Sequence, residues 1–439
     1  MAIAIVEELW ARIRAAIDDA VAAAGEAEAY AADTSSTLST KADKKRIMID
    51  PADFGATPLP DSSGAGADST DALEAAIAHA QSLRDTAGGD VTRQIVINAW
   101  YKFSRDLTID FDGFEMVGQG GETGLLGVNA GVVVGSTEQV VNRPALRNLR
   151  VRRVTTTGNE HGVALDISGG SSNAGPWPVR WALDHVEAES PVSPHGNAPE
   201  KSVAVRMRGT FLGTCNNLYA RNAYYGLVIE GDGEAGTLSA NSVAFFGGEI
   251  QAVQHIGRID KAIGVSFFGM AWEGAALGGM DVNNTRGFTA VGMYHEKNKS
   301  YDMRFGEMGR CQGIHISGGI SSVGGFWGTG EHEVNRSIIL RDASAVDISG
   351  IHFLHYKSRP VVVDEKTAGM VTGQAAALSC TDPTVMGVEV KAGTRWGTTT
   401  APAVAPAGGT TTLWSGTQSD YDALPESTRN AVGFVAVVV

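Results

Sequence analysis

The chain repeats a short sequence unit at a nearly constant interval between residues 243 and 297. A unit that begins Val-Ala-Phe-Phe-Gly-Gly-Glu at Val243 returns as Val-Ser-Phe-Phe-Gly-Met-Ala-Trp-Glu at Val265, 22 residues later. It returns again as Phe-Thr-Ala-Val-Gly-Met-Tyr-His-Glu at Phe288, after a further 23 residues. An internal period of about 20 to 50 residues indicates a solenoid or another repeat array.

The residues inside the unit indicate which solenoid to expect. Short alternating runs of Val, Phe, Tyr and Thr are broken by Gly, Asn and Asp, a pattern typical of strands and turns rather than of amphipathic helices. Three strands and three turns would use about 22 to 25 residues, so each circuit would lie roughly 4.8 Å above the last. The repeat therefore predicts an all-β parallel β-helix. Weaker copies at Ile314 and Val346 have longer intervals, which predict inserted loops.

Composition limits the partners that such a chain would bind. The 55 glycines among 439 residues suit the tight corners of a solenoid, and a net charge of -14 argues against nucleic acid as a partner. Three widely spaced cysteines suggest neither a disulfide framework nor a zinc site, and we expect no cofactor and no metal ion. No apolar run is long enough for a membrane span, and there is no basic signal segment, so we expect no membrane insertion.

An N-terminal helical stem is predicted for residues 1–45. Apolar residues from Ile3 to Ala31 alternate at steps of three and four, which forms a heptad seam over about four heptads. Such a helix either lies on a neighbouring domain or self-associates. We favour self-association, because no domain precedes it and because isoleucine at both seam positions favours three strands. The polar run 34–40 then ends the helix.

Residues 46–385 are expected to form the solenoid. Asp-Phe-Gly-Ala at Asp53 is followed by Asp-Ser-Thr-Asp-Ala at Asp68, and Asp71 with Glu74 three residues later is a helix-start signal. This motif and its short helix resemble the start of pectate-lyase-like right-handed parallel β-helices, a fold frequent in phage tailspikes and tail fibres. The resemblance implies that a helix over 71–84 caps the open end of the solenoid. It leaves the activity open, because lyases, hydrolases and inert adhesins share the motif.

The C-terminal part has a different composition. Residues 386–412 are rich in Thr, Ala, Pro and Gly, which predicts an extended linker. Residues 413–439 contain Trp-Ser-Gly-Thr-Gln at Trp414, then Tyr-Asp-Ala-Leu at Tyr421 and an apolar run over 432–439. This segment resembles a small module found at the ends of phage tail and fibre proteins.

Two glutamates are the main candidates for chemistry. Glu273 and Glu296 each follow a repeat glycine, Gly269 and Gly292, by four residues, so we expect them to point the same way from adjacent coils. Coil spacing would set the carboxylates roughly 5 Å apart, as in a retaining glycosidase, while Glu249 would lie about 9 to 10 Å away, near the inverting distance. Stacked like charges raise one pKa, as a general acid requires. The alternative is a ladder of solvated glutamates without catalytic work.

Neighbouring residues add binding and lyase alternatives. Trp272 and Tyr294 would offer flat apolar faces to sugar rings, and Tyr294 or His295 would be the base of a lyase. A glycine-rich insertion over 325–333 is predicted to overhang a groove as a binding loop. Its candidate contact residues are Trp327, Glu331 and His332.

Together these features predict a phage tail protein that acts at the exterior of the host bacterium. It would be a homotrimer whose stem attaches to other virion tail or baseplate proteins, and it would recognise host surface polysaccharide. Depolymerisation of that glycan would be an added activity, with a glycoside hydrolase favoured over a lyase. The alternative is a non-catalytic adhesin or a structural minor tail protein.

Overall fold

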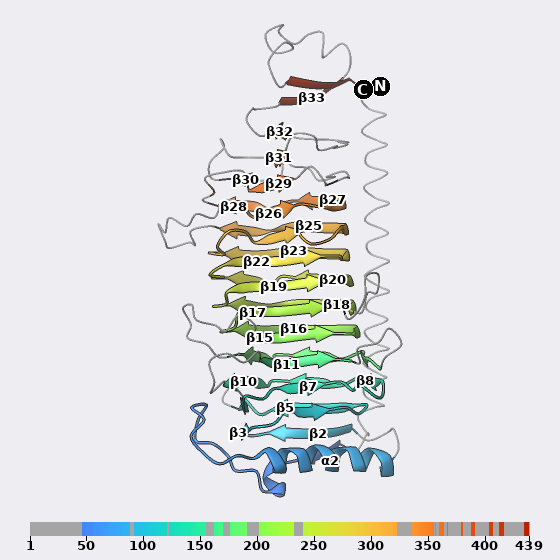
Figure 1. The fold of residues 1–439 in the computed structure, drawn as a ribbon, viewed down its shortest axis with the longest axis vertical. Coiled ribbons are helices and arrows are strands. Elements are labelled where there is room, and N and C mark those ends of the chain that lie inside the picture. The colour runs from blue at the N-terminus through green and yellow to red at the C-terminus, as the bar shows by residue number, and fades with distance from the viewer. Residues whose placement is uncertain are drawn as a thin grey trace, which may run out of the picture. The chain divides into compact units, whose positions relative to one another are not determined.

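The computed structural model divides into two compact units, residues 1–47 with 84–92 and residues 48–83 with 93–439. The second unit holds nearly all of the described residues (Figure 1). The structure describes residues 46–87, 92–120, 123–154, 162–169, 176–190, 202–231, 240–322, 336–354, 356, 360–363, 367, 379–380, 388–390, 404–406, 412–416 and 434–438. The predicted stem over 1–45 lies outside them and stays a prediction.

Within these described ranges, two large sheets contain 20 and 12 strands, and every strand pairing in them is parallel except one isolated bridge. Sheet A contains β1 (Arg46–Ile49), β2 (Thr92–Ile97), β3 (Trp100–Phe103), β5 (Phe114–Gly118), β6 (Gly124–Val128), β8 (Val141–Asn142), β9 (Ala145–Arg147), β10 (Arg150–Val154), β12 (Pro178–Val179), β13 (Ala182–Asp184), β14 (Glu187–Glu189), β16 (Thr210–Arg221), β18 (Ala240–Gln251), β20 (Ala262–Phe268), β21 (Ala271–Glu273), β23 (Arg286–Glu296), β25 (Cys311–Ser322), β27 (Ala343–Ser349), β28 (His352–Leu354) and β30 (Ser379–Cys380).

Sheet B contains β4 (Leu107–Ile109), β7 (Val132–Val134), β11 (Val163–Ser168), β15 (Val203–Arg208), β17 (Tyr225–Glu230), β19 (His255–Asp260), β22 (Gly278–Asn283), β24 (Met303–Phe305), β26 (Ile338–Leu340), β29 (Val361–Val363), β31 (Val388–Val390) and β32 (Val404–Pro406). Strands β33 (Thr412–Gly416) and β34 (Phe434–Val438) form a separate parallel pair, and β34 lies within the apolar run 432–439.

Strand register confirms the period found in the sequence. Val243 of β18 pairs with Val265 of β20, which pairs with Phe288 of β23, at steps of 22 and 23 residues. The weaker copies also pair, since Ile314 of β25 lies opposite Val346 of β27. The predicted parallel β-helix is therefore confirmed, with one coil per repeat and the coils stacked along the solenoid (Figure 1).

The long strands β16, β18, β23 and β25 of sheet A each have a bend near their end, which separates a short second segment from the longer first part of the strand. In β16 the bend lies at Asn217, which has φ 50°, and in β18 it lies at Gly247 and Gly248, which have φ 64° and 93°. A Cβ atom added to Gly248 would lie 2.2 Å from the Leu218 carbonyl oxygen of the coil below, so only glycine fits there. We call residues 218–221 of β16, and their partners on other coils, the second segments.

The interior of the solenoid is filled by stacked apolar side chains. Phe245 and Phe267 have ring centroids 4.6 Å apart, and Phe288 follows at 5.8 Å from Phe267. All three rings are buried, which continues the core from coil to coil. Each new coil therefore buries apolar surface against the one below.

A helix covers the first coils, as the sequence predicted. Helix α2 (Thr70–Ala87) follows the short 3₁₀ helix η1 (Pro51–Phe54), and it buries Leu73 against the solenoid. The two acidic residues of the predicted helix start, Asp71 and Glu74, both pair with Arg105, at 2.6 and 2.8 Å. None of the described helices is long and apolar enough to cross a membrane.

Candidate functional site

The second segments of β18, β21 and β23 carry the candidate glutamates in two outward columns. Glu249 pairs with Ala271, which pairs with Tyr294, and two residues further on Gln251 pairs with Glu273, which pairs with Glu296. Glu273 and Glu296 therefore lie opposite each other on adjacent coils, the arrangement expected from their glycine offsets. Glu249 lies two coils below Glu296, in the neighbouring column. We call these outward positions the acidic face.

The environments of the two paired glutamates differ. Burial raises the pKa of Glu273, and the nearby charges of Glu249 and Glu296 raise it further. Burial also acts to raise the pKa of Glu296, but a hydrogen bond donated by the Tyr294 hydroxyl and the ammonium of Lys297 outweigh it, so that pKa is lowered. Lys297 Nζ lies 3.1 Å from Glu296 Oε1.

These opposite shifts assign different protonation states to two neighbouring carboxyl groups. Glu273 holds a proton to higher pH than usual, whereas Glu296 stays ionised to lower pH. Opposite shifts within a carboxyl pair are how glycosidases separate a general acid from a nucleophile. A spacing of one coil, roughly 4.8 Å between strands, suits the retaining rather than the inverting geometry.

Two of the sequence-predicted residues are in the core. Trp272 is fully buried and His295 is 3% exposed, and their rings meet edge to face at 5.1 Å. Burial lowers the pKa of His295, which keeps the imidazole neutral. The predictions that Trp272 stacks on a sugar and that His295 acts as a lyase base are therefore wrong. The reason is alternation along a strand, because a residue between two outward residues points inward.

The predicted binding loop over 325–333 lies outside the described residues. The roles of its candidate residues Trp327, Glu331 and His332 therefore stay predictions. Tyr294, by contrast, lies on the acidic face beside Glu296. Burial, and then the Glu296 hydrogen bond and charge, raise the pKa of the Tyr294 phenol, so it remains protonated at neutral pH.

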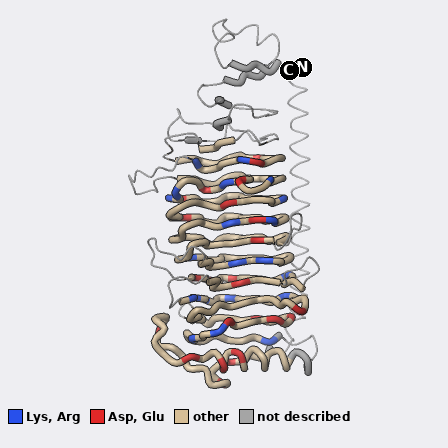
Figure 2. The backbone as a smooth tube through the Cα atoms, viewed as in Figure 1, with Lys and Arg blue, Asp and Glu red and all other residues tan. Residues whose placement is uncertain are grey.

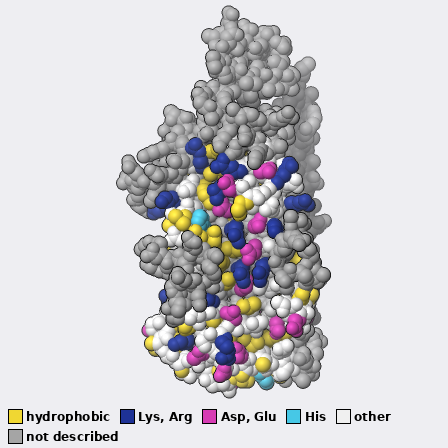
Figure 3. Space-filling view, in the orientation of Figure 1, with side chains coloured by type: hydrophobic (Ala, Val, Ile, Leu, Met, Phe, Trp, Pro, Cys, Tyr) yellow, Lys and Arg dark blue, Asp and Glu magenta, His cyan; other side chains and the backbone are white. Residues whose placement is uncertain are grey.

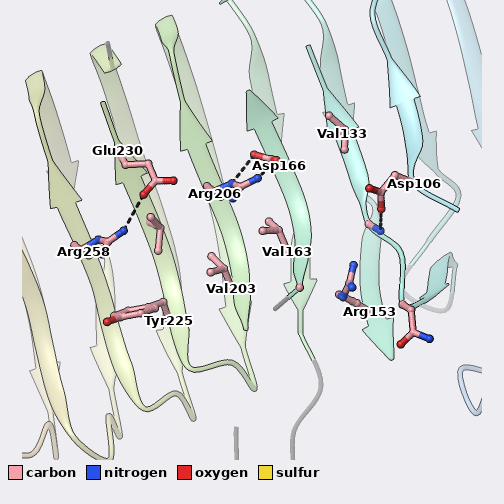
Figure 4. Close-up of a pocket in the computed structure, with 14 residues that line it drawn as sticks. Asp106, Val133, Arg153, Val163, Asp166, Val203, Arg206, Tyr225, Glu230 and Arg258 are labelled. Atoms are coloured by element: carbon pink, nitrogen blue, oxygen red, sulfur yellow. Dashed lines mark hydrogen bonds and ion pairs between the residues drawn. The ribbon is translucent and has the colours of Figure 1, made fainter. Parts of the chain in front are cut away.

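A second site, which we did not predict from the sequence, lies on the outward side of sheet B. A hollow of about 690 Å³ extends along β7, β11, β15, β17 and β19, from Asp106 to Arg258, and we call it the sheet B groove (Figure 4). Arg206 donates to both carboxylate oxygens of Asp166, at 3.1 and 2.5 Å. Arg258 donates to Glu230 at 2.8 Å. These interactions hold charged side chains of both signs in fixed positions.

Apolar side chains lie beside these ion pairs in the groove. Val163, Val203 and Tyr225 occupy one register position on three successive strands. The Arg258 guanidinium lies 5.9 Å from the centre of the Tyr225 ring, and the His255 ring stacks at 5.4 Å from it. Charges of both signs also alternate along the coils more generally (Figures 2 and 3).

The sequence offered little signal for this groove. Asp166 and Arg206 are 40 residues apart, far from the repeat interval, and they become neighbours only through strand register. The run Val-Ala-Leu-Asp-Ile-Ser of β11 could have drawn attention, because an aspartate interrupts an otherwise apolar strand.

The fold defines the class of protein as a parallel β-helix. No known family model and no curated protein matches the sequence. Among solved structures, the chain resembles the gp42 tailspike of Acinetobacter phage vb_AbaP_AS12, with 12% identity and a TM-score of 0.55, over 83% of this chain and 64% of that one. The chain thus spans less than two thirds of that tailspike's length. The predicted resemblance to phage tailspikes is confirmed at the level of the fold.

Two further structures give lower scores. Tailspike protein 2 of bacteriophage CBA120, solved as its enzymatically active domain, has 10% identity and a TM-score of 0.48, over 78% of this chain and 47% of that one. The surface adhesin PfbA of Streptococcus pneumoniae has 9% identity and a TM-score of 0.49, over 76% and 91%.

Proposed function

We propose that this chain is a phage tail protein, a tailspike or tail fibre, that recognises host surface polysaccharide and hydrolyses it at the acidic face. The fold shared with the Acinetobacter phage tailspike supports the tail assignment. The observation that carries the hydrolysis is the register pair of Glu273 and Glu296, whose pKa values shift in opposite directions.

The proposed reaction follows from these protonation states. Glu273 donates its proton to the glycosidic oxygen while the Glu296 carboxylate attacks the anomeric carbon, so the glycosidic bond breaks and a glycosyl ester forms. Glu273, now ionised, then takes a proton from a water molecule that attacks the same carbon. That step breaks the ester, restores both carboxyl groups and retains the anomeric configuration. Tyr294 positions Glu296 through its hydrogen bond.

Lyase chemistry has less support. It would require Tyr294 as a base, and the raised pKa of its phenol works against that role. The other predicted base, His295, is enclosed in the core.

The second candidate function is a non-catalytic adhesin. The Glu296 carboxylate already has two partners within the chain, Tyr294 and Lys297. A glutamate with a purely structural role would have its oxygens bound in the same way. An adhesin would keep the polysaccharide binding and lack only the chemistry.

The test is to incubate the full-length protein with bacterial surface polysaccharides and measure product size. We expect shorter products from the wild type, a loss of about 10² to 10⁴ in turnover for Glu273→Gln and Glu296→Gln, and retained glycan binding in both. The matched control is Glu187→Gln, which removes a carboxylate from the second segment of a lower coil. If the wild-type protein binds the polysaccharide but leaves it at full length, the proposed hydrolysis is wrong and the adhesin function remains.

The proposed attachment to the virion depends on the predicted stem. A heptad seam over Ile3 to Ala31 would join three chains and present them to other tail or baseplate proteins. Light scattering should give three times the chain mass of 45.9 kDa. A monomer in solution would contradict both the trimer and this mode of attachment.

A further inference from the structure

We propose that the sheet B groove binds an uncharged stretch of the glycan, separately from the acidic face. This inference rests on the proposed function and deepens it, because it names the class of sugar that the groove accepts.

The charges that line the groove cancel. Among the described residues that line it, the formal charges are three carboxylates and three guanidiniums, namely Asp106, Asp166, Glu230, Arg153, Arg206 and Arg258. Two of the guanidiniums are bound directly to carboxylates, Arg206 to Asp166 and Arg258 to Glu230. A glycan with a carboxylate on each sugar would bring negative charge beside these acids without an excess of basic groups to balance it. Because the described lining has no net positive charge to attract acidic sugars, the groove favours uncharged ones.

Apolar side chains supply a surface for the faces of sugar rings. Val163, Val203 and Tyr225 follow one another at the same register position, and Val133 lies beside Asp166 on the coil below (Figure 4). A pyranose ring presents C–H groups on its faces and hydroxyls around its edge. Aliphatic and aromatic surface fits the faces, while the flanking charged groups reach the edge.

The polar groups are fixed before any ligand binds. Asp166 is 6% exposed and accepts hydrogen bonds from two of the guanidinium nitrogens of Arg206, Nε and Nη2. Burial acts to lower the pKa of Arg206, but the Asp166 hydrogen bonds and charge outweigh it and raise that pKa, so the guanidinium remains charged. A carboxylate has more lone pairs than one guanidinium uses, so it can still accept from a sugar hydroxyl. Fixed side chains lose little conformational entropy on binding.

The dimensions suit an oligosaccharide rather than a single sugar. The groove crosses five strands of sheet B, and four strand spacings amount to roughly 19 Å. Its volume of about 690 Å³ lies in the range of small-molecule sites. No residue of the acidic face is among the described residues that line the groove, so binding in the groove and hydrolysis are separable by mutation.

Two groove variants and one matched control test the proposal. Tyr225→Ala removes the ring platform, and Arg258→Ala removes one partner of the Glu230 ion pair. The control is Arg304→Ala on the same sheet. Arg304 also forms an ion pair, with Asp281 at 2.6 Å, and also lies over a tyrosine, Tyr301 at 4.6 Å, but it does not line the groove.

The probe is a printed array of bacterial capsular, O-antigen and cell-wall polysaccharides, sorted by the presence of acidic sugars. We expect the full-length wild type to bind glycans that contain uncharged stretches, and Tyr225→Ala and Arg258→Ala to raise the half-saturating concentration at least about tenfold. Arg304→Ala should change it less than about threefold, and circular dichroism should show that all three variants are folded.

Each other outcome has a distinct meaning. Binding confined to glycans with an acidic group on every sugar would overturn the proposed ligand class. Binding that survives both groove variants would overturn the groove, and continued hydrolysis of the bound glycan by those variants would leave the proposed function standing. An array on which the wild type binds nothing would overturn the proposed function itself.

Discussion

Replacement of Phe267 by alanine tests whether the inward and outward positions of sheet A have been assigned correctly. The Phe267 side chain is fully buried, with Phe245 stacked at 4.6 Å and Trp272 edge-on at 5.1 Å. A phenylalanine of this kind buries about 150 to 250 Å², which at about 25 cal/mol per Å² corresponds to roughly 4 to 6 kcal/mol. Alanine retains part of this, so we expect Phe267→Ala to lower the free energy of unfolding by about 3 to 5 kcal/mol.

The matched control is Phe246→Ala, one position after Phe245 on the same strand. The Phe246 ring is 45% exposed and stacks on Phe268 at 5.1 Å, on the outward side. Only the stacking contact and half of the burial are lost there, so we expect Phe246→Ala to lower the free energy of unfolding by about 1 kcal/mol.

Both variants should be measured by urea unfolding followed by tryptophan fluorescence, after a check that refolding is reversible. Trp272 touches Phe267, which makes its emission a local reporter of the change. Equal destabilisation by the two replacements, or a larger effect of Phe246→Ala, would refute the assignment of the interior. An effect of Phe246→Ala that grows with protein concentration would indicate that a second chain covers this side.

Two predictions follow for the acidic face and for the corners. Hydrolysis requires protonated Glu273 and ionised Glu296, so activity should fall at high pH through the raised pKa of Glu273 and at low pH through the lowered pKa of Glu296. Glu249→Gln removes a like charge beside Glu273 and should move the alkaline limb to lower pH, whereas an unmoved limb would contradict the assigned acid. Gly248→Ala combines positive φ with an added Cβ 2.2 Å from the Leu218 carbonyl oxygen, and urea unfolding should show a loss of about 3 kcal/mol or more. At the same bend on the next coil, a Cβ atom added to Gly269 would meet open space, so Gly269→Ala should lower the free energy of unfolding by only about 1 to 2 kcal/mol. Equal losses of stability in the two variants would contradict the steric argument.

The sequence was sufficient for the coil register because the repeat is nearly regular there. Val243, Val265 and Phe288 begin units of almost equal length, and in the structure they are hydrogen-bonded neighbours. The orientation of Trp272 could also have been predicted. Gly269 marks the bend, and if Glu273 points outward, then the residue before it must point inward. Alignment of the repeats on their glycines predicted the register correctly. The alternation of inward and outward residues along the strand would also have predicted that Trp272 points inward.

The sheet B groove could not have been predicted in the same way. Asp166 and Arg206 belong to coils whose connection is longer than the repeat, so no constant offset relates them. Their pairing becomes visible only when the apolar partners Leu165 and Val205 fix the register of β11 and β15. When the connection between two coils is longer than the repeat, the register of their strands cannot be predicted from a constant spacing, although the strands still pair.

The position of the proposed acid along the solenoid has a physical reason in the coils below it. On the lower second segments, acidic and basic residues alternate from coil to coil, so that Arg150 lies 3.1 Å from Glu187 and Arg152 lies 3.6 Å from Glu189. That alternation ends after Arg221, whose partner on the next coil is the uncharged Gln251, and the next two positions, Glu273 and Glu296, are both acidic. Interior positions must carry an apolar side chain on every coil to keep the core filled, but outward positions are free to carry a charge of either sign. A break in charge alternation therefore marks the coil where like charges accumulate, and there burial and then the neighbouring carboxylates raise the pKa of Glu273.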